Sequence, residues 1–298
     1  MDPFARDALG PYARPAPTPS KERAVTIGHS PDPDDAFMVY AFARDRVKVP
    51  GTKVRLVPQD IESLNRWAFE ELLDVTALSA HAYARLSDRY ALLPQGSSFG
   101  DGYGPLVVAR PGTRLQDLSR APVAIPGELT SAYLAGRLAL GDFEAVAMPF
   151  DRILEAVQRG EVQAGLIIHE GQLTYARFGV EKLLDLGAWW KQETGLLLPL
   201  GLNAIRKALP EDLRLAVARA YRESVEYALA HRDEAIRYAM GFGRGIPADL
   251  TDRFVDMYVN EHTTDLRELE VGSLETFYAR AHAAGFLPRP VQVEVVRA

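Results

Sequence analysis

The chain has 298 residues, of which 47% are hydrophobic and 25% charged, the usual mix of a soluble globular protein. Its formal net charge is −6, and no basic block supplies the clustered positive face that a nucleic-acid partner needs. No apolar run is long enough to cross a bilayer, so a membrane partner is not expected. The absence of cysteine excludes disulfides, thiolate nucleophiles and cysteine-based metal sites.

The first 23 residues are rich in proline and charge and lack the apolar stretch of a secretory signal. We interpret residues 1–23 as a flexible leader on a cytoplasmic protein. The rest of the chain is long enough for two domains or one large two-lobed unit.

Strands and helices alternate in the first part of the chain that follows. Strands are predicted at residues 25–27, 54–57 and 75–78, and helices at 36–42, 64–72 and 80–86. Asp60 is the predicted N-cap of the second helix, and Asp34 or Asp35 that of the first. The alternation is typical of a parallel sheet with crossover helices.

A glycine-rich stretch, residues 96–104, leads into a strand at 105–109. It matches neither a Walker A loop nor a dinucleotide-binding fingerprint, so we interpret it as a tight turn or a mobile segment. A second alternating series then has strands at 123–125, 145–148 and 164–168, with helices at 130–140 and 153–159. Beyond Pro199 the pattern is helical, at 213–228, 254–258 and 274–284.

This order predicts an α/β protein of two lobes with a helical C-terminal tail. Residues 24–108 and 202–298 form the first lobe and 109–201 the second. A chain that leaves one lobe, builds another and returns is typical of two-lobed ligand-binding proteins, where a small molecule lies in a cleft at the carboxyl ends of the strands.

His169 directly follows the most hydrophobic strand of the second series and has Glu170 beside it. Histidine suits proton transfer near neutral pH, and strand ends are where α/β folds place reacting groups. From position alone, a structural histidine bonded to a backbone carbonyl is the slightly favoured interpretation. His29 and His81 are secondary candidates, and the histidines show no metal-ligand spacing.

The loop from Ser30 to Asp35 precedes a helix whose free N–H groups suit an anion or a carbonyl. Its three aspartates could also hold Mg²⁺ or Ca²⁺, but the spacing is not that of an EF-hand. Capping and turn formation are therefore the favoured roles for Asp34 and Asp35, and no metal is expected. The hydroxyls of Ser79, Thr130 and Ser131 could bind a carboxylate, or serve simply as N-caps.

Several segments together resemble one enzyme family. They are residues 30–37 (SPDPDDAF), 60–67 (DIESLNRW), 104–109 (GPLVVA), 165–170 (GLIIHE) and 185–190 (DLGAWW). From about Val25 to the C-terminal helices, the chain resembles the 1,4-dihydroxy-6-naphthoate synthases of the futalosine route to menaquinone.

The resemblance implies a two-lobed, periplasmic-binding-protein-like (type II) fold that serves as a cytoplasmic carbon-carbon lyase without a cofactor. The implied small-molecule substrate is cyclic dehypoxanthine futalosine, and His169 is the implied general base. The family's substrate contacts map onto Ala77, Leu78, Ser79, Thr130, Ser131 and Ala132. Ser30 and Asp35 complete the candidate binding residues.

Two departures from the family pattern affect charge. Asp32, Asp34 and Ala36 replace the Cys, Asn and Thr that are common in the first loop, and Ala77 lacks a Lys that close members can carry. Added negative charge beside a carboxylate substrate is unfavourable unless it is paired or turned away. The alternatives are a divergent substrate, a solute-binding protein of a transporter, or a chorismate dehydratase of the same fold; the sequence does not indicate the oligomeric state.

Overall fold

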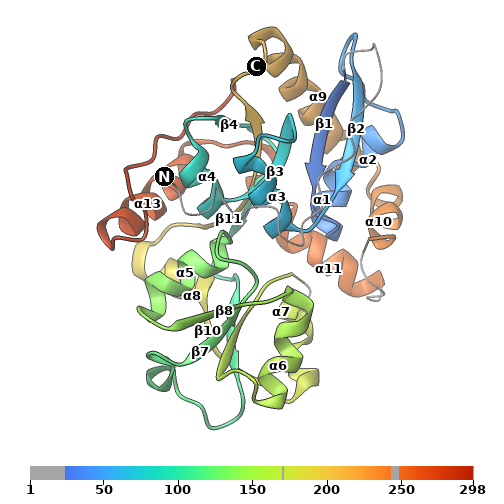
Figure 1. The fold of residues 1–298 in the computed structure, drawn as a ribbon. Helices are drawn as coiled ribbons and strands as arrows, with labels where there is room; N and C mark the ends of the chain where they lie inside the picture. Colours follow the sequence, from blue (N-terminus) through green and yellow to red (C-terminus); the bar gives the residue numbers. More distant parts are fainter. Residues whose placement is uncertain (1–23, 170, 243–247, 298) are drawn as a thin grey trace. The chain divides into compact units, whose positions relative to one another are not determined.

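The computed structural model describes residues 24–169, 171–242 and 248–297 (Figure 1). The predicted leader, residues 1–23, and Glu170 lie outside the described residues. The chain divides into two compact units. Unit 1 contains the described residues up to Ser98, Gly201–Arg267 and the residues from Gln292 onward, and unit 2 contains Phe99–Leu200 and Glu268–Val291. The chain therefore passes between the units four times.

These boundaries differ from the expected lobes in two places. Strand β6 (Leu106–Ala109) belongs to unit 2, because it pairs with strands of that unit on both sides. Helix α13 (Glu268–Ala283) also belongs to unit 2, where the Ser273 hydroxyl accepts a hydrogen bond from the Leu197 backbone N–H at 3.3 Å. The C-terminal helices thus divide between the units instead of forming one tail.

The main sheet of unit 1 has the strand order β2-β1-β3-β11-β4. Its strands are β1 (Ala24–His29), β2 (Lys53–Pro58), β3 (Val75–Ser79), β11 (Leu198–Arg206) and β4 (Tyr90–Leu92). The predicted parallel pairing is confirmed for β1, β2 and β3, whereas β11 runs antiparallel to both β3 and β4. The sheet is therefore mixed, because the chain returns to unit 1 in the opposite direction.

The helix predicted at 80–86 is confirmed, the one predicted at 64–72 begins and ends three residues earlier, and the one predicted at 36–42 is divided into two helices at Val39. The helices between these strands are α1 (Pro33–Met38), α2 (Tyr40–Ala43), α3 (Ile61–Phe69) and α4 (Ala80–Leu86). Asp60 caps α3 as predicted, accepting the Ser63 backbone N–H at 3.0 Å. The predicted capping of the first helix is wrong: Pro33 starts α1, so Asp32 occupies the N-cap position without a side-chain capping bond. Proline is suited to the first helical position, which explains the earlier start.

The later helices of unit 1 pack against α1, against α2 or against one another. They are α9 (Glu211–Ala230), α10 (Arg232–Met240), α11 (Ala248–Tyr258) and α12 (Glu261–Thr264). The buried Ser224 hydroxyl of α9 donates to the Met38 carbonyl at 2.7 Å, which closes the last turn of α1. This packing buries one face of α9 in the main apolar core of the unit.

The sheet of unit 2 has the order β10-β6-β9-β7-β8. The strands besides β6 are β7 (Pro122–Ile125), β8 (Glu144–Ala147), β9 (Ala164–Ile167) and β10 (Glu181–Asp185). The helices besides α13 are α5 (Ser131–Leu140), α6 (Ile153–Arg159), α7 (Gly171–Thr174) and α8 (Leu186–Thr194). Strand β7 is parallel to β8 and β9, whereas β6 is antiparallel to β9 and β10.

The glycine-rich stretch allows close backbone approach in unit 2. A Cβ atom on Gly187 would lie 1.9 Å from the Tyr103 carbonyl oxygen, and one on Gly104 would lie 3.0 Å from the Gly187 nitrogen. Gly102 has a φ of +76°, a left-handed conformation that glycine adopts at little cost. Gly102 thus lies just after a short strand, β5 (Ser98–Gly100), which pairs with β11 and was not expected from the sequence.

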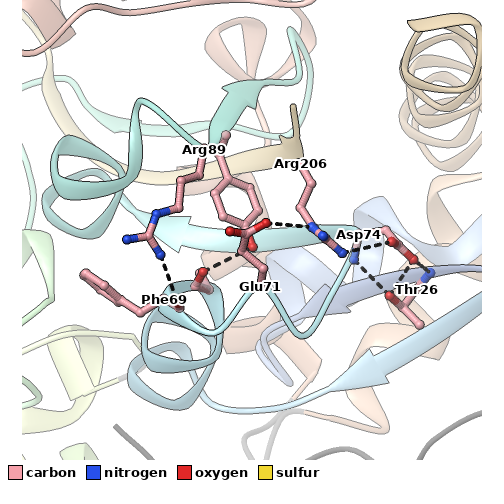
Figure 2. Close-up of polar contacts among 8 residues, drawn as sticks. Thr26, Phe69, Glu71, Asp74, Arg89 and Arg206 are labelled. Atoms are coloured by element: carbon pink, nitrogen blue, oxygen red, sulfur yellow. Dashed lines mark hydrogen bonds and ion pairs between the residues drawn. The ribbon is translucent and has the colours of Figure 1, made fainter. Parts of the chain in front are cut away.

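The amino end of β1 and β3 is closed by a polar network (Figure 2). Asp74 Oδ2 accepts the backbone N–H and the hydroxyl of Thr26, both at 2.9 Å. Arg206, at the end of β11, lies 3.2 Å from Glu71 Oε2 and 3.8 Å from Asp74 Oδ1. Each charge in this network faces an opposite charge or a hydrogen-bond donor.

Candidate functional site

The carboxyl end of the unit 1 sheet carries two of the predicted serines. Ser30 directly follows β1, and Ser79 ends β3, the parallel neighbour of β1. Asn65 of α3 fixes Ser79: its Oδ1 accepts the Ser79 backbone N–H at 2.9 Å, and its Nδ2 donates to the Ser79 hydroxyl at 3.0 Å. The proton of that hydroxyl is donated to no atom of the residues that the structure describes. Ser79 thus keeps a hydrogen-bond donor for a ligand.

Ser30 is surrounded by the carboxylates of its own loop. Its backbone N–H donates to Asp35 Oδ2 at 2.8 Å, and its hydroxyl donates to Asp32 Oδ2. The His29 ring nitrogen Nδ1 lies 2.8 Å from the Ser30 carbonyl oxygen. The loop is therefore held by its own hydrogen bonds, in keeping with the turn-forming role expected for the aspartates.

Burial, and to a lesser extent the neighbouring charges, raise the pKa values of two carboxyl groups in this loop. Burial raises the pKa of Asp35 to about 7, although the Ser30 N–H lowers it, and the Asp32 charge adds to the increase. Burial also raises the pKa of Asp34 well above its usual range, with the charges of Asp35 and Asp32 acting in the same direction. This end of the sheet therefore carries less negative charge near neutral pH than its three aspartates suggest.

The other candidates in β3 lie inside the unit. Leu78 is fully buried and Ala77 nearly so, and Ala77 packs in a small apolar cluster with Leu64 and Trp67. Their backbones pair with β11, Leu78 with Leu202 and Ala77 with Asn203. The two side chains thus contribute to the core of the unit, and their substrate contacts stay a prediction.

Thr130, Ser131 and Ala132 lie at the start of α5 in unit 2. The Thr130 hydroxyl accepts the Tyr133 backbone N–H at 3.2 Å and donates to the Gly127 carbonyl at 2.7 Å, so it is an N-cap. The Ser131 hydroxyl donates to the Leu200 carbonyl at 2.6 Å. Ala132 is buried. The hydroxyl protons of Thr130 and Ser131 are used within the unit, which leaves their oxygens to accept from a ligand.

His169 follows β9 in unit 2 and is half-buried. Its φ is +54°, a left-handed conformation that costs about 1 kcal/mol or more for a residue with a side chain. Its ring meets the Phe150 ring edge to face, with centroids 4.8 Å apart. The backbone turn and the aromatic contact together fix where the imidazole lies at the carboxyl end of β9.

The secondary histidine candidates are both buried in unit 1. Burial lowers the pKa of His29, and its ring meets Phe242 edge to face with centroids 5.9 Å apart. Within residues 24–169, 171–242 and 248–297, no group of three or more histidine, aspartate or glutamate side chains could hold a metal ion. No helix in the described part of the chain has the length and apolarity needed to cross a membrane.

Two positioning residues, Asn65 and Phe150, were not among the candidates from the sequence. Asn65 lies on the face of α3 that buries Leu64 and Ala68, and a polar residue on an apolar helix face is a recognisable signal. Phe150 precedes α6, and nothing in the sequence pattern relates it to His169.

Comparison with solved structures defines the class of the fold. The chain matches an alkanesulfonate-binding protein of Xanthomonas axonopodis pv. citri with a TM-score of 0.66 and 15% identity, covering 96% of this chain and 100% of the other. A ligand-binding component of an import system from Staphylococcus aureus matches with a TM-score of 0.64 and 13% identity, covering 91% and 94%. The protein therefore has the α/β fold of periplasmic binding proteins, as predicted.

More similar relatives define the family. A family model described as menaquinone biosynthesis matches residues 25–283. Proteins named 1,4-dihydroxy-6-naphthoate synthase match from Thermus thermophilus, at 43% identity covering 91% of this chain and 99% of the relative, and from Streptomyces coelicolor, at 37% covering 89% and 95%. A solved structure from Archaeoglobus fulgidus has a TM-score of 0.84 and 46% identity, covering 89% and 99%. The chain belongs to this menaquinone-biosynthesis family and is an enzyme.

Proposed function

We propose that this enzyme is a carbon-carbon lyase that converts cyclic dehypoxanthine futalosine to 1,4-dihydroxy-6-naphthoate in the cytoplasm. The observation that carries the proposal is the 43% identity to a relative of that name, over 91% of the chain. The solute-binding neighbours, at 13–15% identity, support the fold alone.

His169 is the general base of the proposed reaction. Its imidazole takes a proton from the substrate, and the electron pair left behind forms a new π bond as one carbon–carbon bond breaks. The electrons of the broken bond leave with one fragment, which takes up a proton, so the dihydroxynaphthoate and the remainder of the substrate are the two products. Support comes from its position at the carboxyl end of β9 and from the left-handed φ of +54°, which a glycine would adopt with less strain. Asp45, Glu71 and Arg120 also have a positive φ, so this conformation supports the role of His169 through its combination with the strand-end position.

The substrate contacts are assigned on each unit separately. On unit 1, the Ser79 hydroxyl donates a hydrogen bond to the substrate, because Asn65 supplies the donor that this oxygen accepts. The pKa of Asp35 is raised to about 7, so near neutral pH the carboxyl group is protonated in a fraction of the molecules. In that form it donates a hydrogen bond to a carboxylate substrate instead of repelling it. On unit 2, the oxygens of Thr130 and Ser131 accept from the substrate.

The direct test is to incubate the purified protein with cyclic dehypoxanthine futalosine and measure 1,4-dihydroxy-6-naphthoate by liquid chromatography. His169→Ala should reduce kcat by about 10²–10⁴-fold, the usual contribution of a positioned acid-base group, while substrate binding is retained. The matched control is His282→Ala, which removes another histidine of unit 2 whose ring contacts the Leu287 carbonyl at 3.0 Å.

Each outcome has a distinct meaning. An active wild-type protein with an equally active His169→Ala variant would disprove the role of His169 but not the lyase activity. A folded wild-type protein that binds the substrate and leaves it unchanged would disprove the lyase itself. Cell fractionation with an antibody to the protein tests the proposed cytoplasmic location.

A further inference from the structure

A pocket of about 420 Å³ lies in unit 1 beside α2 and α10, which pack against each other. Its volume is in the range of small-molecule sites in proteins. Six residues line it, none of them among the residues assigned to the lyase reaction: Tyr40, Arg44, Arg46, Glu234, Arg237 and Tyr238. Three of the six are arginines, in a chain whose net charge is −6.

The three arginines are not neutralised by their surroundings. Arg44, Arg46 and Arg237 are exposed, and none of their side chains forms a hydrogen bond or an ion pair with another residue of the described chain. The Arg44 guanidinium lies 5.9 Å from the centre of the Tyr40 ring and 5.3 Å from that of Tyr238. Such cation-π contacts hold the guanidinium in place and leave its N–H donors available.

The carboxylate of the pocket, Glu234, already accepts a hydrogen bond from another lining residue. Glu234 Oε2 accepts the Tyr40 hydroxyl at 2.8 Å. This hydrogen bond lowers the pKa of Glu234, and the charges of His231, Arg237 and Arg46 lower it further, so Arg46 and Arg237 act on the same region. Arg46 and Arg237 act on this carboxylate and Arg44 lies over the two tyrosine rings, so the lining holds three guanidinium groups and one carboxylate, and an excess of positive charge is left for a ligand.

We propose that this pocket binds the phosphate group of a small phosphomonoester. A dianion matches the charge left after Glu234 is counted, and the planar fork of guanidinium donors fits phosphate oxygens. The remaining volume beside the rings of Tyr40 and Tyr238 takes the organic part of the ligand. The pocket lining shares no residue with the lyase assignment, so the two proposals can be tested separately.

The test measures binding of inorganic phosphate and of phenyl phosphate to the full-length protein by isothermal titration calorimetry. Arg46→Gln and Arg237→Gln should each weaken binding of the phosphate group by about tenfold, the usual loss for one charge-assisted hydrogen bond. Glu234→Gln keeps an acceptor for Tyr40 and removes the negative charge, so it should strengthen binding. Arg219→Gln, an exposed arginine of α9, is the matched control for the change in net charge.

Each measured outcome is decisive. Tighter binding of phenyl phosphate than of inorganic phosphate supports a phosphomonoester ligand, and equal binding by the two, lost in both arginine variants, supports a site for free phosphate. Failure of the wild-type protein to bind either probe would overturn the proposal. So would a loss in Arg46→Gln and Arg237→Gln no greater than in Arg219→Gln, or weaker binding by Glu234→Gln, with circular dichroism showing that each variant is folded.

Discussion

The charged side chains at the two ends of the unit 1 sheet have different kinds of partners. At the amino end, Asp74 accepts two hydrogen bonds from Thr26, and Arg206 lies between Asp74 and Glu71 (Figure 2). At the carboxyl end, Ser30 donates its backbone N–H to Asp35 Oδ2 and its hydroxyl to Asp32 Oδ2, so these carboxylates are held by neutral donors of their own loop.

This difference suggests that the amino end of the sheet contributes to stability and the carboxyl end to ligand binding. Opposite charges at the amino end satisfy one another and fix where the strands begin. The carboxyl end keeps raised pKa values and a serine with an unused proton, which cost stability and are useful for binding a ligand. Substitutions at the two ends should therefore have different signatures.

The largest expected effect is on the pH dependence of stability at the carboxyl end. Asp35 has a pKa of about 7 in the folded protein, against about 3.9 in an unfolded chain, so the folded state binds more protons between these values. Stability from this group is fully present below about pH 4 and is lost as the pH rises through about 7, by up to about 4 kcal/mol. Asp35→Asn should flatten this slope in urea-denaturation curves measured across the range. An unchanged slope would contradict the assignment.

The next effect comes from the residue that holds Ser79. Asn65→Ala removes a buried amide and leaves the Ser79 N–H without its acceptor, so the free energy of unfolding should fall by about 2–4 kcal/mol. KM for the proposed substrate should rise as well, because Ser79 is no longer fixed. Asn65→Asp keeps the acceptor and should lose less stability. Equal stability of Asn65→Ala and wild type in denaturation would refute this role.

The smallest effect belongs to the amino end. Asp74→Ala should lower the free energy of unfolding by about 1–2 kcal/mol, because Thr26 loses its acceptor in a partly exposed position. Arg206→Met should cost about 1 kcal/mol or less, since partly exposed ion pairs contribute little. Turnover of the proposed substrate should not change in either variant. A clear loss of turnover would mean that the two ends are not functionally separate.

The sequence was sufficient to predict those strands and caps that depend on residues close together in the chain. The strands at β1, β2 and β3 and the Asp60 cap were predicted correctly, because alternation and capping are local signals. Strand β11 was not predicted, since its apolar residues before Gly201 belong to a run without a periodic pattern and its partners are distant in sequence. Long-range pairing of this kind leaves no local signal.

The candidate site shows the same limit. The sequence indicated His169 and Ser79 by their positions at strand ends, and the structure places both there. It could not indicate that Asn65 holds Ser79, or that Phe150 contacts His169, because these contacts join different elements. The start of the helix at Pro33 was predicted too late because three aspartates within four residues offer several equivalent caps.

The four passages of the chain between the units affect how the protein folds while the ribosome synthesises it. Strand β11 completes the unit 1 sheet between β3 and β4 only after about a hundred residues of unit 2 have been synthesised. Unit 2 in turn is incomplete until Glu268–Val291 have been synthesised, and these residues follow most of unit 1 in the sequence. Neither unit has all of its residues until almost the whole chain has left the ribosome, so partly made chains expose unpaired strand edges. Non-local pairing of this kind slows folding, and the nascent enzyme should depend on chaperones more than a protein whose domains are continuous in sequence.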